Sequence, residues 1–186
     1  IGLAIVDQFI DYSNFFTIDV AHFIGKAPNE ADKKDFMARY KKYIGKLSID
    51  GIEKDFDVTE TLLELTADKF LTAIKEVKSI YEHIVLKKGA SNFIPEVSMD
   101  ECDNAQSPIE LFFILAELKH QGVEVQTIAP KFTGLFAKGV DYLGDIDQFA
   151  IEFEQDIAVI QYVIKELGLP KSLKLSVHSG SDKFAI

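Results

Sequence analysis

The second half of the chain alternates between β-rich segments and single amphipathic helices, and this alternation restricts the fold more than any other feature. Predicted strands cover residues 92–99, 123–129 and 173–177, and predicted helices lie between them. A βαβαβ order implies parallel strands joined by right-handed crossovers. The sequence therefore predicts an α/β fold, which we interpret as a fragment of a (β/α)8 TIM-type barrel with parallel strands.

Capping residues define the two helices of this region. Ser107, Pro108 and Glu110 combine a serine N-cap, proline at the first helical position and a capping-box glutamate, so a helix begins at Pro108 and ends near Gln121. Asp145 or Asp147 is expected to cap the second helix, which Gly168 and Pro170 end.

The first ninety residues are less regular. A helix is predicted to begin at Asn29 and to end at Gly45, and a longer one over residues 66–88. Three further segments, residues 2–8, 15–20 and 47–50, are predicted strands. The chain opens at Ile1 without an initiator methionine, so we expect residues 1–186 to form a single unit of a larger TIM-barrel-like catalytic domain.

Composition excludes several classes of partner. The formal net charge is −10, whereas nucleic-acid-binding modules concentrate Lys and Arg. No apolar run approaches the roughly 18 residues that span a bilayer. Cys102 is the single cysteine, which excludes an intrachain disulfide and suits a reducing compartment. We therefore expect a cytoplasmic protein with no nucleic-acid or membrane partner; self-association as a homo-oligomer stays open.

An acidic strand end precedes the first capped helix. Strand periodicity places Glu96, Ser98 and Asp100 on one face and Val97, Met99 and Glu101 on the other. In a barrel the apolar face packs against helices, which directs Glu96 and Ser98 inward and puts Asp100 near the mouth. Asp100 or Glu101 then binds a metal or transfers protons; the alternative is a solvated strand end that caps the next helix.

The last predicted strand delivers a histidine to its carboxyl end. His178 follows Leu173, Leu175 and Val177, which is where parallel α/β enzymes place metal ligands or proton carriers. A hydrogen-bonded structural role is the alternative. The remaining histidines, His22, His83 and His120, are weaker candidates.

A lysine and a glycine-containing loop follow the middle strand. Lys131 is placed to form a Schiff base, stabilise an oxyanion or bind a substrate carboxylate, unless it is an exposed loop lysine. Residues 138–145 are predicted to form a functional loop before a helix N-terminus, without the spacing of a Walker A loop or a dinucleotide fingerprint.

Four stretches together resemble the tagaturonate epimerase family, metal-dependent bacterial enzymes of hexuronate catabolism. They are Glu96–Glu101, Pro130–Gly134, Lys138–Tyr142 and Ser176–Phe184. The similarity runs from Phe93 to Ile186 and, more loosely, back to residues 16–20. Members of the family are much longer, so the resemblance implies that this chain is part of the enzyme.

The resemblance also implies a set of site residues and a cofactor. We assign catalysis to Asp100 and Lys131, and metal binding to Glu101 and His178. Contacts to a sugar-acid substrate are assigned to Lys131, Thr133, Lys138, Ser179 and Lys183. The expected cofactor is a divalent ion such as zinc or manganese.

The implied reaction interconverts D-tagaturonate and D-fructuronate by inversion at C4. The C2 carbonyl acidifies C1 and C3 but not C4, which favours a reversible C3–C4 retro-aldol cleavage with a divalent ion holding the enediolate oxygens. Direct deprotonation and transient oxidation at C4 stay open. Two other functions are kept: a class I aldolase-like sugar-acid lyase in which Lys131 forms a Schiff base, and a non-catalytic sugar-binding or structural domain.

Overall fold

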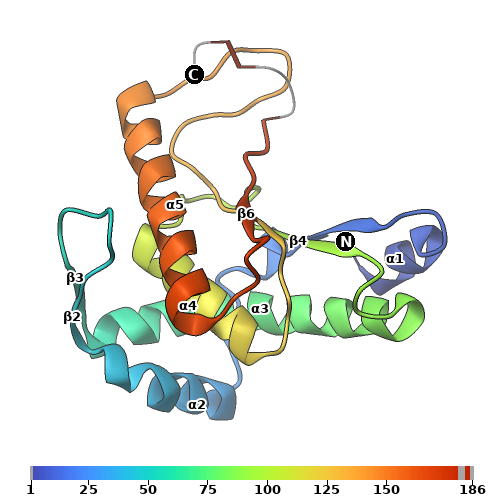
Figure 1. Ribbon diagram of the computed structural model, residues 1–186, viewed down its shortest axis with the longest axis horizontal. Helices are drawn as coiled ribbons and strands as arrows, with labels where there is room; N and C mark the ends of the chain where they lie inside the picture. The colour runs from blue at the N-terminus through green and yellow to red at the C-terminus, as the bar shows by residue number, and fades with distance from the viewer. Residues whose placement is uncertain (1, 180–182, 185–186) are drawn as a thin grey trace.

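A computed structural model describes residues 2–179, 183 and 184. Its centre is a four-stranded parallel sheet in the order β1-β4-β5-β6 (Figure 1). The strands are β1 (Phe15–Asp19), β4 (Ile94–Ser98), β5 (Thr127–Ala129) and β6 (Lys174–Leu175). This arrangement confirms the predicted α/β class and the parallel strands, although β5 and β6 are shorter than the predicted segments.

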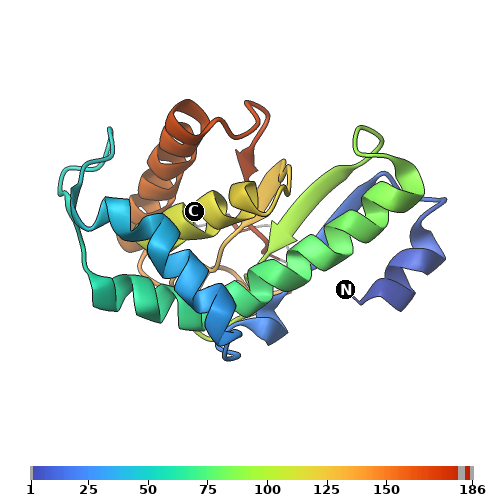
Figure 2. The ribbon, with the colours of Figure 1, turned by 90° about the horizontal axis from the view of Figure 1, so that it is seen from below.

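Five α-helices and two 3-10 turns accompany the sheet. The helices are α1 (Leu3–Phe9), α2 (Glu30–Tyr40), α3 (Glu60–Lys88), α4 (Pro108–His120) and α5 (Ile146–Leu167), and the turns are η1 (Ala21–Phe23) and η2 (Lys41–Tyr43). Seen from below, α3 runs alongside β1 and β4, and α2 lies against α3 (Figure 2). In Figure 1, α5 is the steep orange helix whose N-terminal end points toward the top of the view.

The two faces of the sheet differ in chemistry. Ile18, Val97 and Ile128 stand in register across β1, β4 and β5 and are at most 1% exposed in the core that the helices form. The adjacent register row holds Thr17, Glu96 and Thr127, which therefore point to the opposite face. The sheet thus buries an apolar face under helices and presents a polar face on its other side.

The predicted helix boundaries of the second half are confirmed. The backbone N–H of Ser107 donates to Glu110 Oε2 at 2.8 Å in a capping box that begins α4. Asp145 Oδ1 accepts from the backbone N–H groups of Asp147 and Gln148, which fixes the start of α5. Gly168 ends α5 in the left-handed conformation that favours glycine.

The predicted strand at residues 2–8 is wrong, because these residues form α1. Val6 and Ile10, four residues apart, are the positions that pack into the core, whereas Ile5 is 49% exposed. That spacing matches the period of a helix rather than of a strand. Asp7 Oδ1 of α1 lies 2.6 Å from Nε2 of His83 on α3, which gives this histidine a structural contact.

The segment between α2 and α3 also differs from expectation. The helix ends at Tyr40 and η2 follows, so Gly45 begins a strand instead of ending a helix. The strand predicted at 47–50 is wrong beyond Leu47, because β2 (Gly45–Leu47) ends there and pairs antiparallel with β3 (Phe56–Val58) in a separate two-stranded sheet. Three-residue strands carry too few alternating positions for sequence periodicity to reveal them.

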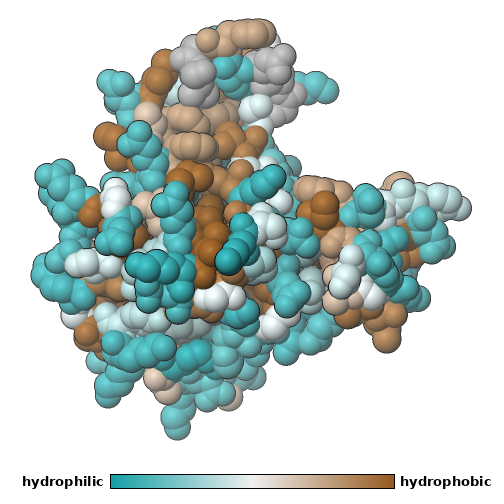
Figure 3. Space-filling model, viewed as in Figure 1, coloured by the Kyte–Doolittle hydropathy of each residue, from teal (hydrophilic) through white to brown (hydrophobic). Residues whose placement is uncertain are grey.

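Part of the exposed apolar surface lies on α5 and on the loop before it. Leu135, Leu143 and Ile151 are each about half exposed, and brown and tan side chains cover much of this region in the hydropathy view (Figure 3). Within the described part of the chain no helix is both long and apolar enough to cross a membrane.

Candidate functional site

The polar face of the sheet carries a buried carboxylate at its centre. Glu96 on β4 is 4% exposed and Ser98, two residues later, is 1% exposed. The Thr17 hydroxyl on β1 donates to Glu96 Oε2 at 2.6 Å. Burying a carboxylate without partners costs several kcal/mol. Glu96 is therefore held on this face by specific contacts, of which Thr17 supplies one.

His178 supplies a second contact and links Glu96 to Asp100. Its Nε2 lies 3.2 Å from Glu96 Oε2, and its Nδ1 lies 3.3 Å from Asp100 Oδ1. Ser98 Oγ lies 3.5 Å from Nδ1 and donates a short hydrogen bond to Asp100. One imidazole therefore stands between two carboxylates, as expected of a proton carrier or of a ligand set at a strand end.

The donor chemistry of this cluster suits a divalent cation, since carboxylate oxygen and imidazole nitrogen are common ligands of zinc and manganese. Its geometry supplies only part of a coordination shell. The two carboxylates approach opposite ring nitrogens, and each nitrogen offers one lone pair. In line with this, residues 2–179, 183 and 184 contain no group of three or more His, Cys, Asp and Glu side chains placed to hold one ion.

A cavity of about 470 Å³ opens next to the cluster. Its lining includes Asp100, Glu101, Lys131, Lys138 and His178, together with apolar side chains. The cavity therefore combines acids, an imidazole and two cations, and it contains the four residues assigned to catalysis and metal binding. Among the described ion pairs, His178 contacts Glu96 and Asp100 rather than Glu101.

Lys131 is positioned by its backbone. Its N–H donates to Gln106 Oε1 at 2.6 Å, and its carbonyl oxygen accepts from the Gln106 N–H at 3.1 Å. Gln106 is itself buried, so this double contact ties the end of β5 to the loop before α4. The side chain of Lys131 is then delivered to the cavity from a fixed main chain.

The other predicted substrate contacts fall into two groups. Lys138 lines the cavity, whereas the Thr133 hydroxyl and N–H both donate to Glu152 on α5. Lys183 Nζ donates to the Ala137 carbonyl at 3.1 Å. Ser179 directly follows His178, and the predicted motif continues into residues 180–182, which lie outside the described residues.

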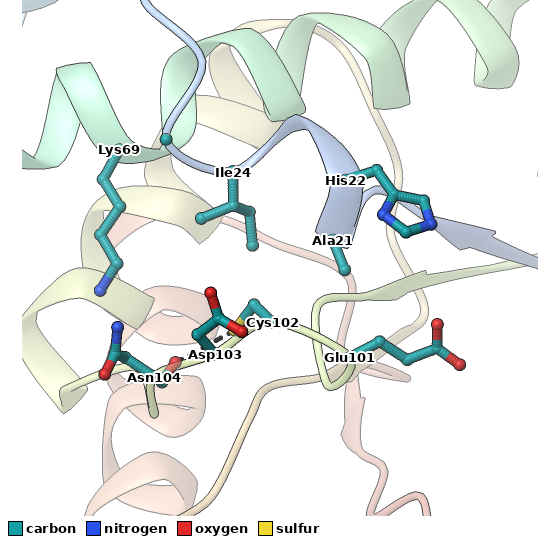
Figure 4. Close-up of a pocket in the computed structure, with 9 residues that line it drawn as sticks. Ala21, His22, Ile24, Lys69, Glu101, Cys102, Asp103 and Asn104 are labelled. Atoms are coloured by element: carbon teal, nitrogen blue, oxygen red, sulfur yellow. Dashed lines mark hydrogen bonds between the residues drawn. The ribbon is translucent and has the colours of Figure 1, made fainter.

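A second cavity of about 440 Å³ lies beside the first, and Glu101 lines both. In Figure 4, His22 and Glu101 lie on one side of it, and Lys69 reaches toward Asn104 on the other. Lys69 Nζ also contacts Glu110 Oε1 at 2.8 Å. His22 is thus placed near Glu101, while His120 lies in the last turn of α4 on the exposed surface.

A sequence model described as "UxaE: tagaturonate epimerase" matches residues 9–186, nearly the whole chain. The chain belongs to the tagaturonate epimerase family. The tagaturonate/fructuronate epimerase of Thermotoga maritima is 35% identical over 145 residues, which are 77% of this chain and 28% of that relative. The resemblance carried by the four sequence stretches is confirmed.

Solved structures agree with this membership. The glycerol-complexed crystal structure of fructuronate-tagaturonate epimerase UxaE from Cohnella laeviribosi matches with a TM-score of 0.78 and 25% identity, covering 100% of this chain and 38% of that one. The native crystal structure from the same organism gives 0.75 and 26% identity, over 98% of this chain and 38% of that one. The chain therefore spans between 28% and 38% of the length of these relatives.

Sequence reasoning did not assign a role to Glu96 or Thr17 in this member of the tagaturonate epimerase family. Strand alternation placed Glu96 on the face opposite Val97, which was correct. Its contact with His178 depends on the order and register of three strands. The periodicity of a single strand does not predict strand order or register. Thr17 was inside a predicted strand, but only the β1–β4 register sets it opposite Glu96.

Proposed function

We propose that this chain forms part of the active site of an enzyme that interconverts D-tagaturonate and D-fructuronate by inversion at C4. The observation that carries the proposal is the cavity in which Asp100, His178, Lys131 and Lys138 meet. Family membership supports it, because the Thermotoga maritima and Cohnella laeviribosi relatives are named for this pair of sugar acids.

We also propose that the four strands belong to a (β/α)8 barrel. Their order in the sheet follows their order in the chain without a reversal, whereas doubly wound sheets reverse at a switch point. Right-handed crossovers in such an order place all helices on one face. The polar face with Glu96 would then line the barrel interior, and the outer strands β1 and β6 would pair with strands from the rest of the enzyme.

The two lysines of the cavity supply the positive charge that an anionic substrate needs. The chain carries a formal net charge of −10 and repels anions at long range, so a hexuronate needs local positive charge. Lys131 and Lys138 line the same cavity as the acid–imidazole cluster. We assign them to the substrate carboxylate and to the oxyanion that develops when the carbon–carbon bond breaks.

The reaction follows from the position of the substrate carbonyl. A base removes the C4 hydroxyl proton, the C3–C4 electron pair moves toward the C2 carbonyl, and an aldehyde and an enediolate result. Addition to the other aldehyde face re-forms the bond with C4 inverted, and the proton returns to oxygen. We assign the base to Asp100, whose carboxylate lies 3.3 Å from Nδ1 of His178 and is oriented by it.

A divalent ion, when bound, would act as a Lewis acid toward the substrate oxygens. Glu96 and Nε2 of His178, 3.2 Å apart, would hold it together with ligands from other parts of the enzyme. Asp100 then remains available as the base, while Nδ1 carries the imidazole proton and orients the Asp100 carboxylate. Glu96 thus replaces Glu101 as the carboxylate that we propose to bind the ion together with His178.

The test uses the full-length enzyme with tagaturonate in deuterium oxide. Formation of fructuronate without deuterium at C4 is expected, because retro-aldol cleavage leaves the C4 hydrogen on carbon. Deuterium at C4 would instead show direct deprotonation. Loss of turnover with a chelator and its return with Zn²⁺ or Mn²⁺ tests the ion, and absence of any epimerisation would overturn the proposed function.

A further inference from the structure

The loop before α5 is built around one buried tyrosine. Tyr142 is 6% exposed, and its ring packs against Phe136 and Phe149 with centroid distances of 4.9 and 5.8 Å. Its hydroxyl donates to the Thr133 carbonyl at 2.9 Å. Tyr142 therefore ties the end of this loop to its beginning.

Two glycines make room for this side chain. A Cβ atom at Gly134 or at Gly144 would lie 2.6 Å from Cζ of Tyr142, closer than Cβ atoms approach other atoms in real structures. Gly134 also has φ +92°, which side chains rarely adopt. The phenol ring is thus enclosed between two backbone segments that must lack side chains.

The same contacts shape the loop into an arm beside the cavity. Leu135 and Leu143 exchange backbone hydrogen bonds at 2.9 and 3.3 Å in an antiparallel bridge. Between them the chain carries Phe136 and Lys138, both of which line the cavity, while Tyr142 is not among the lining residues. At its base, Thr133 is held by Glu152 on α5.

We propose that Tyr142, enclosed by Gly134 and Gly144, is a positioning residue that fixes the arm of residues 133–145 so that Lys138 meets the carboxylate of the sugar-acid substrate. The inference rests on the proposed function for the identity of the ligand. It assigns to Tyr142 a role in affinity for the acid group, exerted through Lys138, and no contact with the reacting carbons.

The test compares two ligands and two tyrosines in the full-length enzyme. Tyr142→Phe keeps the ring and removes the hydrogen bond, so the KM for tagaturonate should rise about fivefold with kcat nearly unchanged. Affinity for D-tagatose, the uncharged analogue without the carboxylate, should stay the same. Tyr81→Phe, at a tyrosine of equal burial on α3, should change neither.

A double-mutant cycle separates positioning from general stability. Lys138→Met should weaken tagaturonate binding, and Lys138→Met with Tyr142→Phe should be no weaker than Lys138→Met alone, because both act on one contact. Gly134→Ala should resemble Tyr142→Phe with a larger effect. Additive losses, equal weakening of tagatose, or a fall in kcat alone would overturn the role of Tyr142.

Failure of the proposed function gives a different pattern. A wild-type enzyme that binds tagaturonate in calorimetry but does not epimerise it overturns the reaction and leaves the arm testable by the same affinities. A wild-type enzyme that binds no tagaturonate overturns both.

Discussion

Glu96 Oε2 and His178 Nε2 lie 3.2 Å apart although their strands are not neighbours, because β5 stands between β4 and β6. Ala129 of β5 is in register with Ser98 and is completely buried. We infer that this short side chain leaves room for the imidazole to reach across the intervening strand. We therefore expect the contact between acid and imidazole to depend on the small side chain of Ala129.

Replacing Ala129 with valine should separate the two groups. Two added methyl groups on the polar face would occupy the space over which the imidazole passes, at a cost of about 1–3 kcal/mol in stability. Activity should fall at least tenfold further than the loss of folded enzyme at the assay temperature accounts for. Ala73→Val, at a buried alanine of α3, is the matched control, which should lose stability but retain turnover.

His178 should be required for both metal and turnover. His178→Ala removes the group between Glu96 and Asp100, so we expect about a 100-fold loss of turnover with a parallel loss of bound metal. Metal analysis and the epimerase assay on the same samples check this. His83→Ala, whose histidine contacts Asp7 on the far side of the sheet, should leave both values intact; an unchanged His178→Ala enzyme would assign His178 a structural role.

Asp100 and Glu101 should differ sharply. Asp100 lies 3.3 Å from His178 Nδ1, whereas Glu101 lies at the junction of two cavities. Asp100→Asn should lower kcat about 100-fold, and Glu101→Gln less than about tenfold. Steady-state kinetics of the two variants side by side gives the comparison. Equal, small effects would mean that Asp100 and Glu101 only cap the next helix or contact solvent and have no catalytic role.

Lys131 should act through its charge. Lys131→Met should lower activity about 100-fold without loss of bound metal, and Lys131→Arg should retain part of the activity, since the planar guanidinium keeps the charge but fits differently. A Schiff-base lysine behaves otherwise: neither variant would be active, and borohydride would trap substrate on the wild-type enzyme. That result would favour the aldolase alternative.

Local chemistry explains what the sequence could predict. The ends of α4 and α5 depend on Ser107, Asp145 and Gly168 and their immediate neighbours, so they were correct. The meeting of Asp100 and His178 was also accessible, because carboxyl ends of parallel strands share one edge. The hairpin β2–β3 and the contacts of Glu96 depend on pairing between distant segments, which local patterns do not encode.

The stability of the enzyme should fall as pH rises from about 4 to about 8, because of Asp156. This carboxyl is 3% exposed on α5, and burial together with the neighbouring Glu152 raises its pKa to about 8. Between the unfolded pKa near 3.8 and this value, the folded state keeps a proton that the unfolded state has released. Stability then decreases with pH across that window, and the full penalty is present above it.

Asp156→Asn should therefore remove this pH dependence. The amide cannot ionise, so the variant should melt a few degrees above the wild type at about pH 9, and the gap should shrink to about a third of that at about pH 5. Thermal unfolding of the full-length enzyme at both pH values measures the difference. Glu154→Gln, at an exposed acid of the same helix, should show no such pH-dependent gap. A gap between Asp156→Asn and wild type that is equal at both pH values would mean that Asp156 ionises with an ordinary pKa and is stabilised by solvent.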